Sequence, residues 1–288
     1  MVSNNINLCS LEEISSIHKR LIASLRSFFK NAGMSKAVLG LSGGIDSALV
    51  AALAAEALGA ENVTGLIMPS GFSTLHSVSD AVDLAENLGM KYHIIPIEKI
   101  YDKVIKEIDP IFEGDYHWDN TQENLQARIR GLILMAYSNR KGALLLNTSN
   151  KSELAVGYGT LYGDLSGALM VIADIYKLQV YALSNYINTE REIIPFSTIS
   201  KAPSAELRED QKDTDSLPDY NLLDPILYRM VELGQTHEEI ISDGVARELV
   251  ERIVKLRKGA SFKAHQMPPV IKITEKPLLD KSKWIVTE

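Results

Sequence analysis

The 288-residue sequence has few of the residue patterns from which disulfide, metal and membrane-spanning structures are built. Cys9 is its single cysteine, which excludes an intramolecular disulfide and a CxxC zinc or redox pair, and favours a cytoplasmic protein. The six histidines are scattered without HExxH or HxH spacing, so we expect them to be surface or packing residues. The sequence lacks an apolar run of about eighteen residues, so no membrane span is predicted.

The overall balance of residues is that of an ordinary globular protein. Apolar residues make up 45 % and charged residues 23 % of the chain. The formal net charge is −7, which argues against a broad surface for nucleic acid or membrane. We therefore expect small molecules as partners, and neither nucleic acid nor a membrane.

Short apolar runs alternate with helical patterns along much of the chain. The strands are predicted at 36–41, 62–69, 91–97 and 143–149, with a last short strand at 192–197. The helices are predicted at 11–31, 46–59, 79–89, 121–142 and 177–188. This alternation predicts an α/β fold: a doubly wound, mostly parallel sheet of about five strands with helices on both faces.

We expect residues 1–288 to form one domain with four regions. An N-terminal helix at 1–33 precedes the α/β core at 34–198. Residues 199–221 are rich in Pro, Ser and Asp and lack periodicity, which predicts a mobile substrate loop. Residues 222–288 are predicted to form a small helical cap, with two or three helices up to 257, and an irregular tail.

The stretch SGGIDS at 42–47 follows the first predicted strand and opens a helix. Adjacent glycines let backbone N–H groups approach an anion, and the helix N-terminus adds positive potential. No GxxxxGK[ST] lysine is present, so this is not a Walker A loop. Asp46 would suit such a site if Mg²⁺ bridged it to phosphates. The alternative is a plain Gly-Gly turn with Asp46 as the helix N-cap.

Two further motifs contain charged residues that could belong to the same site as SGGIDS. NTSNKSELAVGYGTLYGD at 147–164 follows the fourth strand; its Glu153 could be a second metal carboxylate, or only an acid in the first turn of a surface helix. ENLQARIRG at 123–131 places Arg128 and Arg130 on different faces of an apolar helix. Either arginine could bind phosphate bidentately, or could be solvated or ion-paired.

These motifs together are specific. SGGIDS resembles the pyrophosphate loop of the N-type ATP pyrophosphatases. With ENLQARIRG, NKSELAVGYGTLYGD and PSAELREDQKDTDSLPDY, in this order over most of 36–225, the chain resembles the NAD synthetases. The resemblance implies an adenine nucleotide alpha hydrolase-like fold and the amidation of deamido-NAD to NAD. In that reaction ATP first forms an adenylate, and AMP and pyrophosphate are released.

The resemblance also implies roles for residues at matching positions. The implied catalytic residues are Asp46, Asp164 and Lys177, and the implied Mg²⁺ ligands are Asp46 and Glu153. The implied ATP contacts are Leu39, Ser42, Gly43, Gly44, Ile45, Asp46, Ser47, Met68, Arg128, Thr148, Lys177 and Ser204. The implied deamido-NAD contacts are Asn124, Arg130, Lys151, Tyr158, Asp164 and Lys263. The resemblance leaves open which of Arg128 and Arg130 reaches the nucleotide.

Other functions are weighed against this one. Another adenylating amidotransferase of the same loop class would share SGGIDS but not the fourth-strand motif. An adenine-nucleotide sensor on the same fold would not need Glu153, Asp164 and Lys177 together with Asp46. The nitrogen source is expected to be free ammonia, because this chain does not include a glutaminase domain of the kind that glutamine-dependent synthetases carry. A separate glutaminase partner is the alternative.

The resemblance implies a homodimer whose deamido-NAD site draws on both subunits. Leu132, Ile133 and Met135, in the apolar helix at 121–137, are candidates for this interface, and simple burial within the monomer is the alternative.

Overall fold

Seven parallel β-strands are found among the residues that the computed structural model describes, which are 10–114, 117–279 and 281–285. Their order across the sheet is β3-β2-β1-β4-β5-β6-β7. The strands are β1 (Ala37–Gly40), β2 (Val63–Ile67), β3 (Lys91–Ile94), β4 (Leu144–Asn147), β5 (Leu169–Met170), β6 (Val270–Ile271) and β7 (Trp284–Ile285). Cys9, on which the prediction about disulfides depends, lies outside the described residues.

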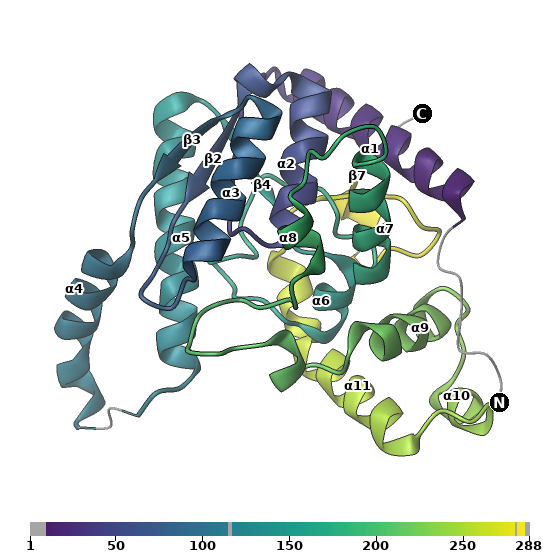
Figure 1. The fold of residues 1–288 in the computed structure, drawn as a ribbon. Helices are drawn as coiled ribbons and strands as arrows, with labels where there is room; N and C mark the ends of the chain where they lie inside the picture. Colours follow the sequence, from purple (N-terminus) through teal and green to yellow (C-terminus); the bar gives the residue numbers. More distant parts are fainter. Residues whose placement is uncertain (1–9, 115–116, 280, 286–288) are drawn as a thin grey trace.

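Helices cover both faces of this sheet (Figure 1). One face carries α1 (Leu11–Ala32), α2 (Ile45–Leu58), α3 (Leu75–Leu88), α7 (Lys177–Ile187) and α8 (Phe196–Ser200). The other carries α4 (Glu98–Ile108) and α5 (Asn120–Lys141). The predicted doubly wound, parallel α/β fold is therefore confirmed. None of the described helices is both long and apolar enough to cross a membrane.

The central strands are apolar throughout because both of their faces are buried. Val38 of β1 packs with Leu145 of β4 in the core under α5, and the two residues are partners in the β1–β4 ladder. Leu39 and Leu146, the next residues along, pack in the opposite core under α2. Such two-sided burial is typical of parallel sheets and explains the continuous apolar runs of the sequence.

The strands differ from the prediction in their number and at one position. The sheet has seven strands instead of about five because β5, β6 and β7 are two residues long, too short to leave a periodic pattern. Two of these strands lie in the tail that was expected to be irregular. The predicted strand at 192–197 does not form: Phe196–Ser200 is the helix α8, with Pro195 as its N-cap. Proline has no N–H to donate to a strand ladder.

The C-terminal helices build a second core beside the sheet. These helices are α9 (Tyr220–Val231), α10 (His237–Ser242) and α11 (Arg247–Ala260), and they lie where a helical cap was predicted. Leu223 and Leu227 of α9 and Ile253 of α11 are fully buried there, against Ala155 of the short helix α6 (Lys151–Val156). The assignment of the whole chain to one domain stays a prediction.

A buried ion cluster ties the C-terminal segment to α6. The Nζ of Lys151, which is fully buried, lies 2.7 Å from Asp174 Oδ1 and 2.5 Å from Glu232 Oε1. It also donates to Thr274 Oγ1 at 2.8 Å. Asp174 Oδ2 in turn accepts hydrogen bonds from the backbone N–H groups of Ile273 and Thr274. One lysine therefore joins α6, the end of α9 and the segment that carries β6.

We predict that Lys151→Met destabilises the protein by about 3–5 kcal/mol, because it leaves Asp174 and Glu232 buried without their cation. Urea unfolding followed by circular dichroism measures the loss. Lys103→Met is the matched control, because it breaks the exposed pair with Glu107 and should change stability by less than about 1 kcal/mol. Equal stability of the two variants would contradict this account of the cluster.

Candidate active site

A cavity opens where the sheet changes its direction of winding. The chain leaves β1 for β2 on one side, and β4 lies on the other side of β1, so the connections after β1 and β4 diverge. Gly40–Ser42 and Asn147–Ser149 follow these two strands and line a cavity of about 290 Å³. Crevices at such switch points are where open α/β sheets bind ligands.

The glycine-rich loop forms one wall of this cavity. Gly43 has φ +77°, and a Cβ there would stand 2.1 Å from the carbonyl oxygen of Ser77, so only glycine fits. Gly44 is the N-cap of α2. The Ser47 hydroxyl donates to Gly44 O at 2.9 Å and lies 3.1 Å from the exposed Ser42 hydroxyl. These contacts hold the N-terminus of α2 open toward the cavity.

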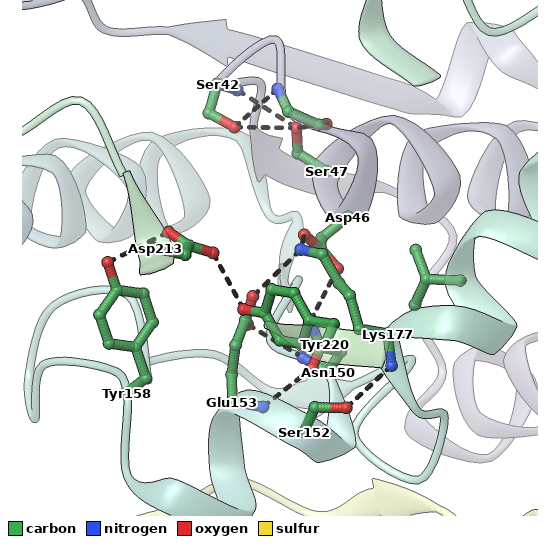
Figure 2. A network of polar contacts seen from close by, with 12 residues as sticks. Ser42, Asp46, Ser47, Asn150, Ser152, Glu153, Tyr158, Lys177, Asp213 and Tyr220 are labelled. Carbon is green, nitrogen blue, oxygen red and sulfur yellow. Dashed lines mark hydrogen bonds and ion pairs between the residues drawn. The ribbon is translucent and has the colours of Figure 1, made fainter. Parts of the chain in front are cut away.

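Asp46 is not the helix cap that the alternative interpretation made it. Gly44 takes that place, and Asp46 lies in the first turn of α2 with its carboxylate directed at other elements. Its Oδ1 accepts from Asn150 Nδ2 at 2.8 Å, and its Oδ2 lies 2.5 Å from the Nζ of Lys177. Glu153 Oε1 is 3.4 Å from the same Nζ. Figure 2 shows the ammonium of Lys177 facing carboxylates from α2 and α6.

Burial and neighbouring charges set the protonation of Glu153 and Lys177. Burial raises the pKa of Glu153 to about 8, and the negative charge of Asp46 adds to the shift. Burial alone would lower the pKa of Lys177, but Asp46 and Glu153 outweigh it and raise that pKa above its ordinary value. Lys177 therefore stays a cation, while Glu153 shares its site with a second carboxylate.

A third carboxyl group, that of Asp213, reaches the cavity from the segment between α8 and α9. Its oxygens accept from the hydroxyls of Tyr158 at 3.1 Å and Tyr220 at 2.9 Å (Figure 2). Burial raises the pKa of Asp213. The ring of Tyr220 lies under the Nζ of Lys177, 5.2 Å from ring centroid to nitrogen. The site thus gathers three carboxyl groups around one lysine.

The donor set suits a magnesium ion. Among the described residues no three His, Cys or acidic side chains are arranged as a complete metal cage. Mg²⁺ does not need one, because it prefers one or two carboxylates together with waters and phosphate oxygens. Asp46 and Glu153 could supply two such oxygen ligands beside the glycine-rich loop.

Asp164 lies on another part of the same cavity wall. Its side chain is accessible from the cavity. The protein atoms packed around it still displace part of its solvent, and this desolvation raises the pKa of its carboxyl. Thr160 N donates to Asp164 Oδ1 at 2.5 Å, and Asn147 Nδ2 donates to the Asp164 backbone oxygen at 2.6 Å. The end of β4 therefore fixes the position of this acid.

The structure separates the two arginines that the sequence left undecided. Arg130 lines the cavity, and its Nε donates to Met68 O at 3.0 Å. Burial lowers the pKa of Arg130 to about 10, while Asp164 and Glu206 act in the opposite direction. Arg128 is exposed and donates to Leu161 O at 3.3 Å, outside the cavity lining. Arg130, and not Arg128, is thus in position to meet an anion there.

Most of the predicted site residues line the same cavity. These are Ser42, Gly44, Ile45, Asp46, Ser47, Met68, Arg130, Thr148, Glu153, Tyr158, Asp164, Lys177 and Ser204. Their roles stay predictions, because no bound ligand tests them. Gly43 does not line the cavity itself, but packs against the backbone of Ser77.

Four other residues with predicted contacts do not line the cavity, and their roles also stay predictions. Leu39 is fully buried in the core under α2, and Gly40 and Leu41, at the end of β1, line the cavity instead. Lys151 is fully occupied by its buried cluster. Asn124 accepts from Thr160 Oγ1 at 2.6 Å. Lys263 donates to the carbonyls of Gly157 and Gly159, so it supports the loop that precedes Asp164.

Several residues of the site were not predicted from the sequence. Asn150 accepts the N–H of Glu153 as the N-cap of α6 and donates to Asp46. Glu206 and Lys201 line the cavity from the loop after α8, as does Asp213. Asn150 was within the quoted motif NKSELA, where N-x-x-E is the signature of a capping box. The loop residues have no periodic signal that could have found them.

The fold and the cavity define a class: an α/β protein with a nucleotide-type anion nest at its switch point. Comparison with known proteins gives the family. A family model described as NAD synthase matches residues 17–268. The glutamine-dependent NAD(+) synthetase of Synechocystis is 51 % identical over 256 residues, covering 89 % of this chain and 46 % of the relative. The chain therefore belongs to the NAD synthase family, and it spans about half the length of the curated relatives it matches.

Solved structures agree with this membership. The NH3-dependent NAD synthetase of Campylobacter jejuni has a TM-score of 0.72 and 33 % identity, covering 90 % of this chain and 99 % of that one. The glutamine-dependent synthetase of Acinetobacter baumannii, solved in complex with ADP, has a TM-score of 0.65 and 38 % identity, covering 93 % and 48 %. The predicted resemblance is confirmed.

We predict that Glu153→Gln stabilises the ligand-free protein at pH 8. A carboxyl whose folded pKa is raised to about 8 binds its proton more tightly in the folded state. Its contribution to stability is therefore greatest below the unfolded pKa, about 4.3, and is lost as the pH rises toward 8. The gain should be on the order of 1–3 kcal/mol at pH 8 and much smaller at pH 5. Urea unfolding at both pH values measures it, and a variant less stable than the parent at pH 8 would contradict the charge balance described above.

Proposed function

We propose that this protein catalyses the ATP-dependent amidation of deamido-NAD to NAD. The observation that carries the proposal is the convergence of Asp46, Glu153 and Lys177 beside the glycine-rich loop, in a chain of the NAD synthase family. A sensor that only bound nucleotide would not need a buried lysine held between two carboxylates. Another adenylating amidotransferase with this loop would not match a NAD synthase model over 17–268.

The reaction has two steps. A carboxylate oxygen of deamido-NAD attacks the α-phosphorus of ATP, the bond to the bridging oxygen breaks, and pyrophosphate leaves. The nitrogen of ammonia then attacks the activated carbonyl carbon, the carbon–oxygen bond to AMP breaks, and one proton is lost. The first step explains why the loop has no Walker lysine, since the leaving group is pyrophosphate and the nest holds both of its phosphates.

Each group of the cavity has a place in this scheme. The N–H groups and hydroxyls of residues 42–47 bind pyrophosphate at the N-terminus of α2. Asp46 and Glu153 would hold Mg²⁺, which supplies positive charge to the leaving pyrophosphate. Arg130 faces the cavity and suits the remaining phosphate charge. Lys177 stabilises negative charge that develops on the phosphate and acyl oxygens. Asp164, whose raised pKa suits proton transfer, accepts the proton that ammonia loses.

The nitrogen donor is a finer part of the proposal. Relatives such as those of Synechocystis and Aquifex aeolicus, 51 % and 45 % identical, are named glutamine-dependent. These names favour ammonia released from glutamine by a glutaminase over free ammonia as the physiological source. We propose that the residues described here consume ammonia in either case. A homodimer with a shared deamido-NAD site and a cytoplasmic location are also proposed.

A second substrate deserves a direct test. The NMN synthetase of Francisella tularensis has a TM-score of 0.75 and 27 % identity, covering 90 % of this chain and 98 % of that one. This similarity raises a second candidate substrate for the same cavity, nicotinate mononucleotide. Both substrates carry the same pyridine carboxylate, so only the size of the group beyond the ribose separates them.

We predict that the purified protein forms NAD and pyrophosphate from ATP, Mg²⁺ and deamido-NAD with ammonium, and faster than it amidates the mononucleotide. Asp46→Asn should abolish pyrophosphate release, and Lys177→Met should lower kcat by about 10²–10³. Glu209→Gln, an exposed change in the same cavity loop, is the control. The same assay is repeated with glutamine in place of ammonium as the nitrogen donor. Normal pyrophosphate release by Asp46→Asn would refute the metal assignment, and preference for the mononucleotide would refute the assigned substrate.

A further inference from the structure

Glu206 holds the loop after α8 against the first turn of α3. Its Oε1 accepts from Ser77 Oγ at 2.6 Å and from Thr74 Oγ1 at 3.1 Å, and its Oε2 accepts from Thr74 N at 3.2 Å. Thr74 is the N-cap of α3, so the carboxylate lies at the positive end of that helix. In Figure 1 the loop runs from α8 past the ends of α3 and α5 before it returns to α9.

The same turn of α3 touches the glycine-rich loop from its other side. The carbonyl oxygen of Ser77 fills the space where a Cβ of Gly43 would stand. The hydroxyl of Ser77 also accepts from Lys201 Nζ at 3.1 Å, and that amine pairs with Asp80 at 3.0 Å. Ser77 is therefore placed between the anion nest and the loop that carries Glu206.

The loop is attached to α5 as well. Gln126 Nε2 donates to Leu207 O at 2.8 Å, and Arg208 pairs with Glu123 at 3.2 Å. Within the loop, the Ser204 hydroxyl accepts from Glu206 N at 3.1 Å. Glu206 itself has φ +48°, a left-handed backbone that a non-glycine residue keeps only where its surroundings fix it. The loop thus spans the cavity from α3 to α5.

We propose that Glu206 is a positioning residue for ATP, which couples the loop at 201–213 to the anion nest through Ser77. The inference rests on the proposed function, because it takes the nest to be the ATP phosphate site. The three donors turn the carboxylate toward α3. Without them its negative charge would face a cavity that also contains Ser42, Arg130 and Ser204. The three hydrogen bonds therefore hold the carboxylate on α3 and set the position of Gly43 and Ser204 around the phosphates.

The test measures equilibrium binding of α,β-methylene-ATP with Mg²⁺, which requires no turnover. Glu206→Gln keeps the shape of the side chain but loses its charge, and Kd should rise about 10- to 100-fold. Glu209→Gln, an exposed carboxylate on the same loop, is the matched control and should stay within about twofold. A Glu206→Gln variant that binds the analogue as tightly as the parent overturns the proposal.

Two further measurements separate positioning from a purely structural role. Because Ser77 and Glu206 act as one unit, Ser77→Ala should raise Kd, and the double variant should bind no more weakly than Glu206→Gln alone. In the full assay, KM for ATP should rise while kcat and KM for deamido-NAD change less than about threefold. Additive losses, or an equal effect on all three kinetic parameters, would overturn the coupling.

The outcome also separates this inference from the proposed function. If the parent protein binds the analogue but makes no NAD, the proposed reaction is refuted. The positioning role of Glu206 is then judged by the Kd values alone. Should Glu206→Gln fail to fold, Glu206→Asp keeps the charge on a shorter stem and must show an intermediate rise in Kd. An unchanged Kd for that variant counts against the proposal.

Discussion

The ammonium of Lys177, held between the carboxylates of Asp46 and Glu153, is the interaction on which the rest of the site depends. These carboxylates come from α2 and α6, which follow two neighbouring strands of the sheet. Two acids brought together at the end of a buried sheet repel one another, and this repulsion adds to the burial that raises the pKa of Glu153. The lysine supplies one positive charge, and the acids around it can carry more negative charge than this once Glu153 loses its proton. The site is therefore stable without a ligand yet still attracts a cation that arrives with phosphate.

The first turn of α6 shows how the fold holds this arrangement. Four successive residues of the sequence NKSE each bind a different element. Asn150 binds Asp46 of α2, Lys151 binds the C-terminal segment, and Ser152 donates to Asp224 of α9 at 2.5 Å. Glu153 faces Lys177 of α7. A helix of six residues can hold four elements because its N-terminal side chains fan out around one turn.

The sequence was sufficient to predict the parallel α/β architecture, since long apolar strands and glycine-ended helices leave clear patterns. Together with the family resemblance, it also named residues such as Asp46 and Lys177, which the structure places side by side in the cavity. It was insufficient where the same residue type serves two purposes. Lys151 and Lys177 are both buried lysines with two carboxylate partners, but only one of them faces the cavity. The choice between Arg128 and Arg130 depended on the rotation of α5 about its axis. Glu206 and Asp213 lie in an aperiodic loop, whose path is set by tertiary contacts alone.

The cluster around Lys151 has a consequence for the order in which the molecule is made. Asp174 is bound by Thr274, one hundred residues further along the chain. Contacts of such separation close large loops and form late, since the entropy of closure is lost before they contribute. During synthesis the glycine-rich loop, α6 and Lys177 are all present long before the segment that completes the hydrogen bonds of this cluster and the far edge of the sheet. The nascent chain thus contains every candidate catalytic side chain while one of its buried charges still lacks part of its final environment. Until residues 270–276 arrive, β5 lacks its partner β6, and the carboxylate of Asp174 lacks the hydrogen bonds from Ile273 and Thr274.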